Sequence, residues 1–204
     1  MSSVAQGIHI PDPMNLEAWE EQDEPLATDY YNEDQVTCFT VLKAAFAGPE
    51  CYVAMNRWLR MDPNHPEDQL LPDVHVAVGV ADTYRTTYDP IVEGKPPDLL
   101  VELLSESSLK ADRQLKPPRY AALGVREYVV VNPGVQFKAP PPQGWRLSRT
   151  GPAEPIPLAP DGSLSIQTLP VRFAMLYHRL AVLDRETGEP LTLSQATMPR
   201  LVME

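Results

Sequence analysis

The sequence has little cysteine, no long apolar run and no excess of basic residues. Only two cysteines occur, Cys38 and Cys51, which excludes a disulfide framework and lacks the paired spacing of a zinc site. The N-terminus has no basic region followed by an apolar run, and no stretch approaches the roughly 18 apolar residues of a membrane-spanning helix. We therefore expect a soluble, cytoplasmic protein that has no membrane partner.

The formal charge of −11 argues against nonspecific adhesion to nucleic acid, because Lys and Arg supply most of the affinity for phosphate backbones. The acidic excess is unevenly distributed along the chain. Residues 1–50 hold one basic residue and ten acidic ones, whereas residues 51–150 hold twelve of each. The central region is therefore neutral and remains compatible with a nucleic-acid substrate.

A length of 204 residues and a hydrophobic content of 43% suit one domain with appendages. Residues 1–31 combine acidic residues with proline, which is typical of a partly flexible arm. We assign residues 32–137 to an α/β core. Residues 138–204 are then a Pro-rich segment followed by a C-terminal β appendage of the same domain.

Within the core, hydrophobic spacing and turn residues predict an alternation of helices and strands. LLVELL at Leu99–Leu104 is an apolar run with one charge in it, as expected of a strand buried on both faces. The other predicted elements are a helix at 33–47, strands at Cys51–Met61, Leu71–Val80 and Tyr128–Val131, a loop at Asp62–Gln69, and a helix in the second half of Lys110–Gly124.

Two predicted strands each carry a carboxylate. Because alternate side chains of a strand share a face, Asp73 and His75 point one way, and Glu102 lies on one face with Leu100 and Leu104. Carboxylates from neighbouring strands can meet and bind Mg²⁺, which prefers oxygen ligands and activates a bound water. A nearby lysine can orient that water or offset developing charge. Asp73, Glu102 and Lys116 would fill these roles.

Each of these residues also has a structural interpretation. Asp73 can be a solvated carboxylate at the start of a strand, and Glu102 can be half of a buried ion pair with Lys116 or Arg113. Lys116 can be a solvated surface lysine. His75 can contact the site or be an ordinary core histidine.

Several segments together resemble a known family. They are LPDVHVAVG, PPDLLVELLSESS, the Asp112…Lys116…Tyr120 spacing and GVREYVVVNP. This set is similar to the Uma family of restriction endonucleases in the PD-(D/E)XK superfamily. The resemblance implies a restriction-endonuclease-like mixed β-sheet flanked by helices, with a small antiparallel C-terminal appendage. It also implies that Asp73 and Glu102 are metal ligands.

The resemblance further implies that Lys116 is a motif lysine that has migrated to the following helix, since Leu104 occupies its standard position. Tyr120 and Ser105 match family positions that support the site, and Glu33 matches an accessory carboxylate of the first helix. Pro117-Pro118 follows the lysine directly and predicts that the helix starts there, which would displace Lys116.

The function implied is Mg²⁺-dependent (or Mn²⁺-dependent) hydrolysis of phosphodiester bonds in DNA. Leu104, the proline pair and the net charge favour an alternative, a catalytically impaired nuclease fold that acts as a binding or scaffold module. A third hypothesis is a different acid-based hydrolase that uses the same carboxylates. A homodimer is an open expectation, because two cuts in a duplex need two sites.

Overall fold

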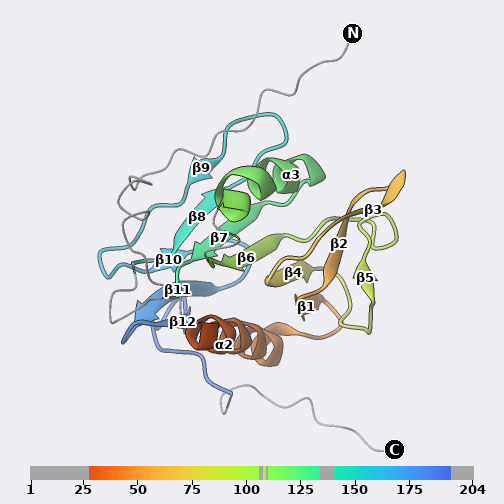
Figure 1. Cartoon of the computed structure of the whole chain (residues 1–204). Coiled ribbons are helices and arrows are strands. Elements are labelled where there is room, and N and C mark those ends of the chain that lie inside the picture. Colours follow the sequence, from red (N-terminus) through yellow and green to blue (C-terminus); the bar gives the residue numbers. More distant parts are fainter. Residues whose placement is uncertain (1–27, 106–107, 109, 134–139, 194–204) are drawn as a thin grey trace, which may run out of the picture.

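A six-stranded mixed sheet forms the centre of the computed structural model, which describes residues 28–105, 108, 110–133 and 140–193 (Figure 1). The strand order is β1-β4-β6-β7-β8-β9, with β6 and β7 parallel and the other neighbours antiparallel. The strands are β1 Cys51–Met55, β4 Val74–Val78, β6 Leu99–Leu103, β7 Glu127–Val131, β8 Gln143–Arg146 and β9 Glu154–Pro155.

Helices lie on both sides of this sheet (Figure 1). Helix α2 (Thr28–Phe46) covers one face together with a small antiparallel sheet of β10 (Leu164–Ser165), β11 (Val171–Leu176) and β12 (Arg179–Asp184). The π-helical turn η1 (Ala111–Leu115) and helix α3 (Lys116–Leu123) lie over the other face. A second small sheet joins β3 (His65–Leu70), β2 (Trp58–Asp62) and β5 (Thr87–Tyr88). The predicted α/β mixed sheet with a small C-terminal antiparallel sheet is confirmed.

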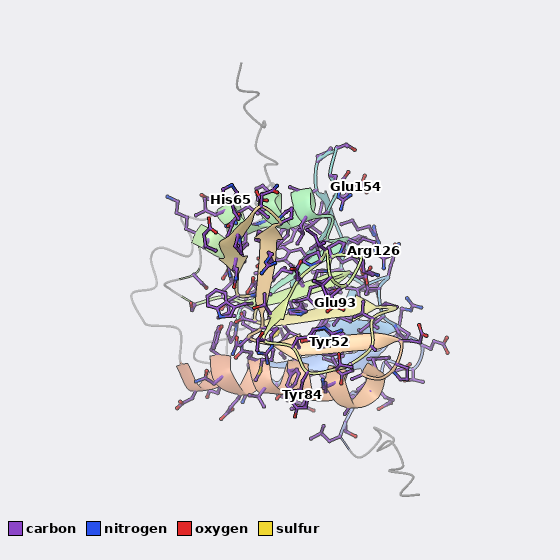
Figure 2. All side chains as sticks on the ribbon, turned by 90° about the vertical axis from the view of Figure 1, so that its right-hand side faces the viewer. Tyr52, His65, Tyr84, Glu93, Arg126 and Glu154 are labelled. Carbon is purple, nitrogen blue, oxygen red and sulfur yellow. The ribbon has the colours of Figure 1, made fainter. Side chains whose placement is uncertain are left out.

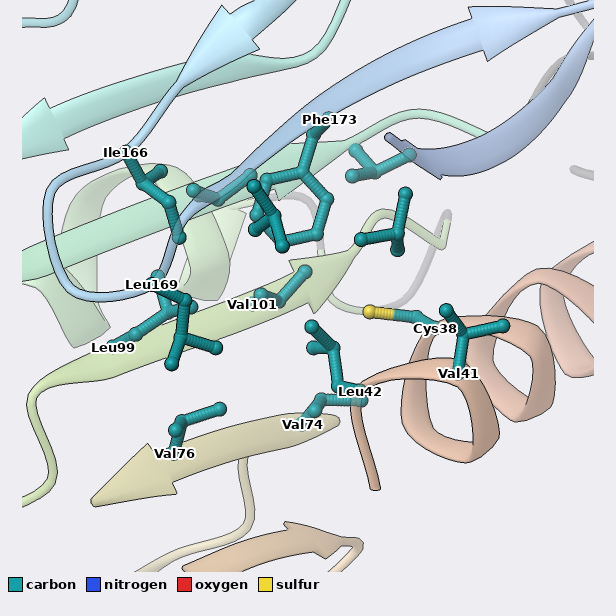
Figure 3. Close-up of a cluster of buried hydrophobic side chains, with 14 of the residues drawn as sticks. Cys38, Val41, Leu42, Val74, Val76, Leu99, Val101, Ile166, Leu169 and Phe173 are labelled. Atoms are coloured by element: carbon teal, nitrogen blue, oxygen red, sulfur yellow. The ribbon is translucent and has the colours of Figure 1, made fainter. Parts of the chain in front are cut away.

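The alternation of side chains along β6 divides the interior into two cores. Leu99, Val101 and Leu103 pack against α2 and β11, where Phe173 lies over Val101 (Figure 3). Leu100 and Leu104 pack on the opposite face, beneath α3. Every residue of β6 is buried, as the run LLVELL predicts. The second face, which also carries Glu102, is where the candidate site forms.

The single strand predicted for Cys51–Met61 is wrong, because the chain turns at Asn56. This residue has φ 48°, in the left-handed region that asparagine tolerates better than most residues. The turn ends β1 in the central sheet and starts β2 in the small one. The predicted loop at Asp62–Gln69 is also wrong, since most of it forms β3, a hairpin partner of β2. Pro66 is accommodated because β3 is an edge strand.

The first helix begins earlier than predicted, at Thr28, so residues 28–31 of the expected arm are its first turn. Residues 1–27 lie outside the described part of the chain. Among the described helices, none has both the length and the apolar character needed to cross a membrane.

Arg179 of β12 anchors helix α2 to the C-terminal sheet. Its guanidinium lies 2.8 Å from Asp34 Oδ1 and 2.6 Å from Glu33 Oε2. Asp34 is buried, whereas Glu33 is exposed. The Asp34 pair therefore carries most of the stabilisation, because an ion pair at the surface contributes little.

We predict that Arg179→Gln lowers the free energy of unfolding by about 1–3 kcal/mol, because it leaves the buried Asp34 carboxylate without its cation. Urea unfolding followed by circular dichroism measures this change. The matched control is Arg119→Gln, which removes a surface ion pair with Asp68 and should cost less than about 1 kcal/mol. Equal losses for the two variants would contradict the anchoring role.

Candidate metal-binding active site

Two carboxylates meet on the face of the sheet beneath α3. The antiparallel register of β4 and β6 pairs Val74 with Val101, so Asp73, one residue before β4, lies opposite Glu102. The Asp73 amide donates a hydrogen bond to Glu102 Oε2 at 3.2 Å. The Leu103 amide in turn donates to Asp73 Oδ2 at 2.7 Å. Both side chains are buried, with Glu102 only 1% exposed.

Three side chains from η1 and α3 complete the cluster. Lys116 Nζ lies 3.0 Å from Glu102 Oε1 and 2.5 Å from Asp112 Oδ1. The Tyr120 hydroxyl donates to Glu102 Oε1 at 2.8 Å. Asp112, Lys116 and Tyr120 follow one another at intervals of four residues and so share one side of the helical segment. Lys116 thus lies between two carboxylates.

The proline pair does not displace Lys116, contrary to the sequence-based expectation. Helix α3 begins at Lys116 itself, which places Pro117 and Pro118 in its first turn, where proline is tolerated. The wider turn η1 precedes the helix without a break, and the Tyr128 hydroxyl anchors it by donating to the Asp112 carbonyl at 2.7 Å. Such π turns inside helices are common at functional sites. The lysine therefore reaches Glu102.

Helix α2 contributes two further side chains that the sequence analysis missed. The Tyr31 hydroxyl donates to Asp73 Oδ1 at 2.5 Å, and Gln35 Nε2 donates to the same oxygen at 2.7 Å. Gln35 Nε2 also donates to Asn56 Oδ1 at 2.9 Å. The signal in the sequence was the spacing of four residues between Tyr31 and Gln35, which puts two polar groups on one side of a helix. These donors orient the Asp73 carboxylate.

Three of the predicted supporting residues lie outside this cluster. Glu33 points toward Arg179 instead. His75 shares the face of Asp73 but is enclosed by the Tyr52 and Tyr88 rings, whose centroids lie 5.6 and 5.4 Å away. Burial lowers the pKa of His75 to about 3, so it is neutral near pH 7. Ser105 forms a hydrogen-bonded turn with Ser108, with 2.9 Å between the two hydroxyl oxygens.

The cluster holds three buried carboxylates and one cation. Burial, which disfavours the charged form, raises the pKa of Asp73 and raises that of Glu102 to about 8. Burial alone would lower the pKa of Lys116, but Glu102 and Asp112 raise it. If all four groups are ionised, Asp73, Glu102 and Asp112 leave two negative charges uncompensated by Lys116. Protonation or a bound cation relieves this excess.

The donor set, which consists of carboxylate oxygens, fits a hard divalent cation. Asp112 is 1% exposed, and neither of its carboxylate oxygens accepts a hydrogen bond within the described part of the chain, although Lys116 lies close to Oδ1. In the described residues no three Asp, Glu, His or Cys side chains form a ready-made metal cage. Mg²⁺ does not need one, because it usually keeps several waters and takes one or two protein carboxylates.

We predict that metal-free protein loses stability as the pH rises from about 5 to 8. Glu102 has a folded-state pKa of about 8 and an ordinary value of 4.5, so the folded state holds more protons than the unfolded state across this window. The stability that protonated Glu102 contributes is largest below pH 4.5, declines as the pH rises, and is lost above pH 8. Urea unfolding in EDTA at several pH values measures the slope, which is at most about 1.4 kcal/mol per pH unit for one proton.

The Glu102→Gln variant should flatten this slope, whereas Glu154→Gln, at an exposed position of β9, should leave it unchanged. A wild-type slope of zero or of opposite sign would contradict the raised pKa of Glu102.

Comparison with known proteins gives the chain a family. A family model described as "Putative restriction endonuclease" and named Uma2 matches residues 22–169, which is well over half of the chain. The chain belongs to the Uma2 family. The family resemblance noted from the sequence is thus confirmed, and Uma2 membership identifies the protein as restriction-endonuclease-like.

The Uma2 chain is also similar to a solved structure titled "Crystal structure of a putative nuclease belonging to DUF820 from Anabaena variabilis ATCC 29413". The two share 12% sequence identity with a TM-score of 0.43, over 68% of this chain and 73% of the other. No curated protein matches the chain.

Proposed function

We propose that this protein is an endonuclease that hydrolyses DNA phosphodiester bonds with Mg²⁺ or Mn²⁺, and that Asp73 and Glu102 bind the metal. The observation that carries the proposal is the meeting of these two buried carboxylates across β4 and β6, with an amide-to-carboxylate hydrogen bond of 3.2 Å between the residues. Membership in a restriction-endonuclease family supports the reaction class.

The bound metal would polarise the phosphodiester and lower the pKa of an attacking water. Lys116, which lies 3.0 Å from Glu102 Oε1, is placed to donate a hydrogen bond to that water or to a phosphate oxygen. Tyr120 holds Glu102 through its hydroxyl, while Tyr31 and Gln35 hold Asp73. Leu104 occupies the position of the standard motif lysine and carries no charge, so Lys116 supplies the cation from the helix instead.

The first experiment is calorimetric titration of the purified chain with Mn²⁺ at pH 7.5. Wild type should bind Mn²⁺, and Asp73→Asn should weaken binding by about 100-fold, because it removes one of two charged ligands. Asp161→Asn is the matched control, since Asp161 is an exposed carboxylate paired with Arg172 far along the chain. The same Mn²⁺ affinity in wild type and Asp73→Asn would remove the assigned metal site.

The second experiment measures cleavage of plasmid and single-stranded DNA with Mn²⁺. We expect Glu102→Ala to abolish cleavage and Lys116→Met to slow it by about 100-fold, since loss of one group that stabilises transition-state charge typically costs this much. Lys110→Met is the control, because Lys110 is an exposed lysine at the start of the same helical segment. Cleavage that survives Glu102→Ala would refute the assignment.

One observation favours the second candidate function, a nuclease fold that serves as a binding or scaffold module. Both oxygens of Asp73 already accept hydrogen bonds from protein donors, from Tyr31 and Gln35 on one oxygen and Leu103 on the other. A network saturated in this way can be purely structural. The absence of any Mn²⁺ response in wild type would favour this function. A cytoplasmic location and a homodimer remain predictions.

A further inference from the structure

A cavity of about 350 Å³ lies on the same side of the sheet as the candidate active site, but at the other end of the parallel strands. Asp98 immediately precedes β6, and Gly124, Val125 and Arg126 precede β7, so the cavity forms where these strands begin. Glu102 lies near the opposite end of β6. The two sites are therefore separate.

Three cations and one carboxylate line this cavity. Both oxygens of the Asp98 carboxylate have partners. Its Oδ2 accepts hydrogen bonds from Lys95 Nζ at 2.7 Å and from the Val78 amide at 2.8 Å, and its Oδ1 lies 2.7 Å from Arg126 Nη2. With Arg149, the three cations exceed the one carboxylate by two charges. This excess is unusual in a chain whose net charge is −11.

Arg149 is held in place without an acidic partner among the described residues. Its guanidinium donates to the Leu123 carbonyl at 2.7 Å, at the C-terminal end of α3, where the helix dipole favours a cation. It also lies directly over Gly124, which has φ 102° and where any Cβ atom would collide with the guanidinium. The glycine thus permits the close approach that positions Arg149.

The remaining groups give the cavity an apolar floor and an open cationic rim. Pro96, Val125 and Leu147 line it, and Val125 is buried. Arg126 is 63% exposed at the surface, between Glu93 and Glu154 in the view of Figure 2. Small-molecule pockets span about 300–1,000 Å³ and combine apolar walls with a few polar groups, so the size suits a ligand of one or two rings.

We infer that this cavity binds a phosphate monoester the size of a mononucleotide, with the phosphate held by Arg126, Arg149 and Lys95. A phosphate monoester carries a charge of about −1.5 to −2 near pH 7, which balances the cationic excess of the cavity. Guanidinium groups match pairs of phosphate oxygens. Pro96, Val125 and Leu147 would contact the organic part. This inference is independent of the proposed nuclease activity.

The test is calorimetric titration of the full chain in EDTA and low salt, first with inorganic phosphate and then with AMP. Both should bind at one site and compete, with AMP the tighter ligand because it also covers the apolar floor. Arg126→Gln and Arg149→Gln should each weaken binding about tenfold, as expected for loss of a charge-assisted hydrogen bond. Arg185→Gln, an exposed arginine of the C-terminal sheet region, is the control.

Binding of phosphate must also persist in Asp73→Asn, because the cavity is separate from the carboxylate cluster. Failure of wild type to bind phosphate and AMP, or equal affinity in wild type, Arg126→Gln and Arg149→Gln, would overturn the inference. A cooperative thermal unfolding transition shows that each variant folds. Oligonucleotides with and without a 5′-phosphate then distinguish a DNA strand end from a free nucleotide as the source of the phosphate.

Discussion

The antiparallel register between β4 and β6 is the constraint on which the candidate site depends. It places Asp73 opposite Glu102 on the face that α3 covers. Because side chains alternate along a strand, a shift of one residue would send Glu102 into the core against α2. The close-packed apolar residues on both faces of β6 resist such a shift, so the packing of the sheet also holds the two carboxylates together.

Burying three carboxylates in this interior costs free energy, because charged groups lose their hydration. The surrounding elements offset that cost with hydrogen-bond donors and one cation. Helix α2 supplies donors to Asp73, the β6 backbone supplies the Leu103 amide, and α3 supplies Lys116 and Tyr120 to Glu102. Burial, and after it the neighbouring Asp112 and Asp73 carboxylates, raise the pKa of Glu102. A structure that retains such an excess in a buried position is typical of a functional site, where a cation or substrate completes the electrostatics.

The two ends of β6 and β7 have opposite electrostatic character. The carboxylates gather where β6 ends, and Lys95, Arg126 and Arg149 gather where β6 and β7 begin. Asp98 immediately precedes β6 and Glu102 lies within it, yet Asp98 is paired with two cations whereas Glu102 shares a single lysine with Asp112. Local surroundings, not the net charge of −11, therefore decide what each region can bind.

The sequence by itself determined the elements whose signals are local. Period-two alternation predicted that Asp73 and Glu102 would each share a face with particular neighbours, the apolar run predicted a buried β6, and Gly124 predicted the end of a helix. The family motifs indicated that the two carboxylates belong to one site. All of these depend on residues close in the chain or on a recognisable set of segments.

Only the tertiary structure decided which partner each polar group meets. Glu33 pairs with Arg179, 146 positions away, while Tyr31 and Gln35 of the same helix donate hydrogen bonds to Asp73. His75 shares a face with Asp73, but rings from β1 and β5 enclose it. Periodicity assigns a side chain to a face, but the packing of distant elements against that face determines its contacts, because a long-range contact depends on the whole fold and not on local spacing.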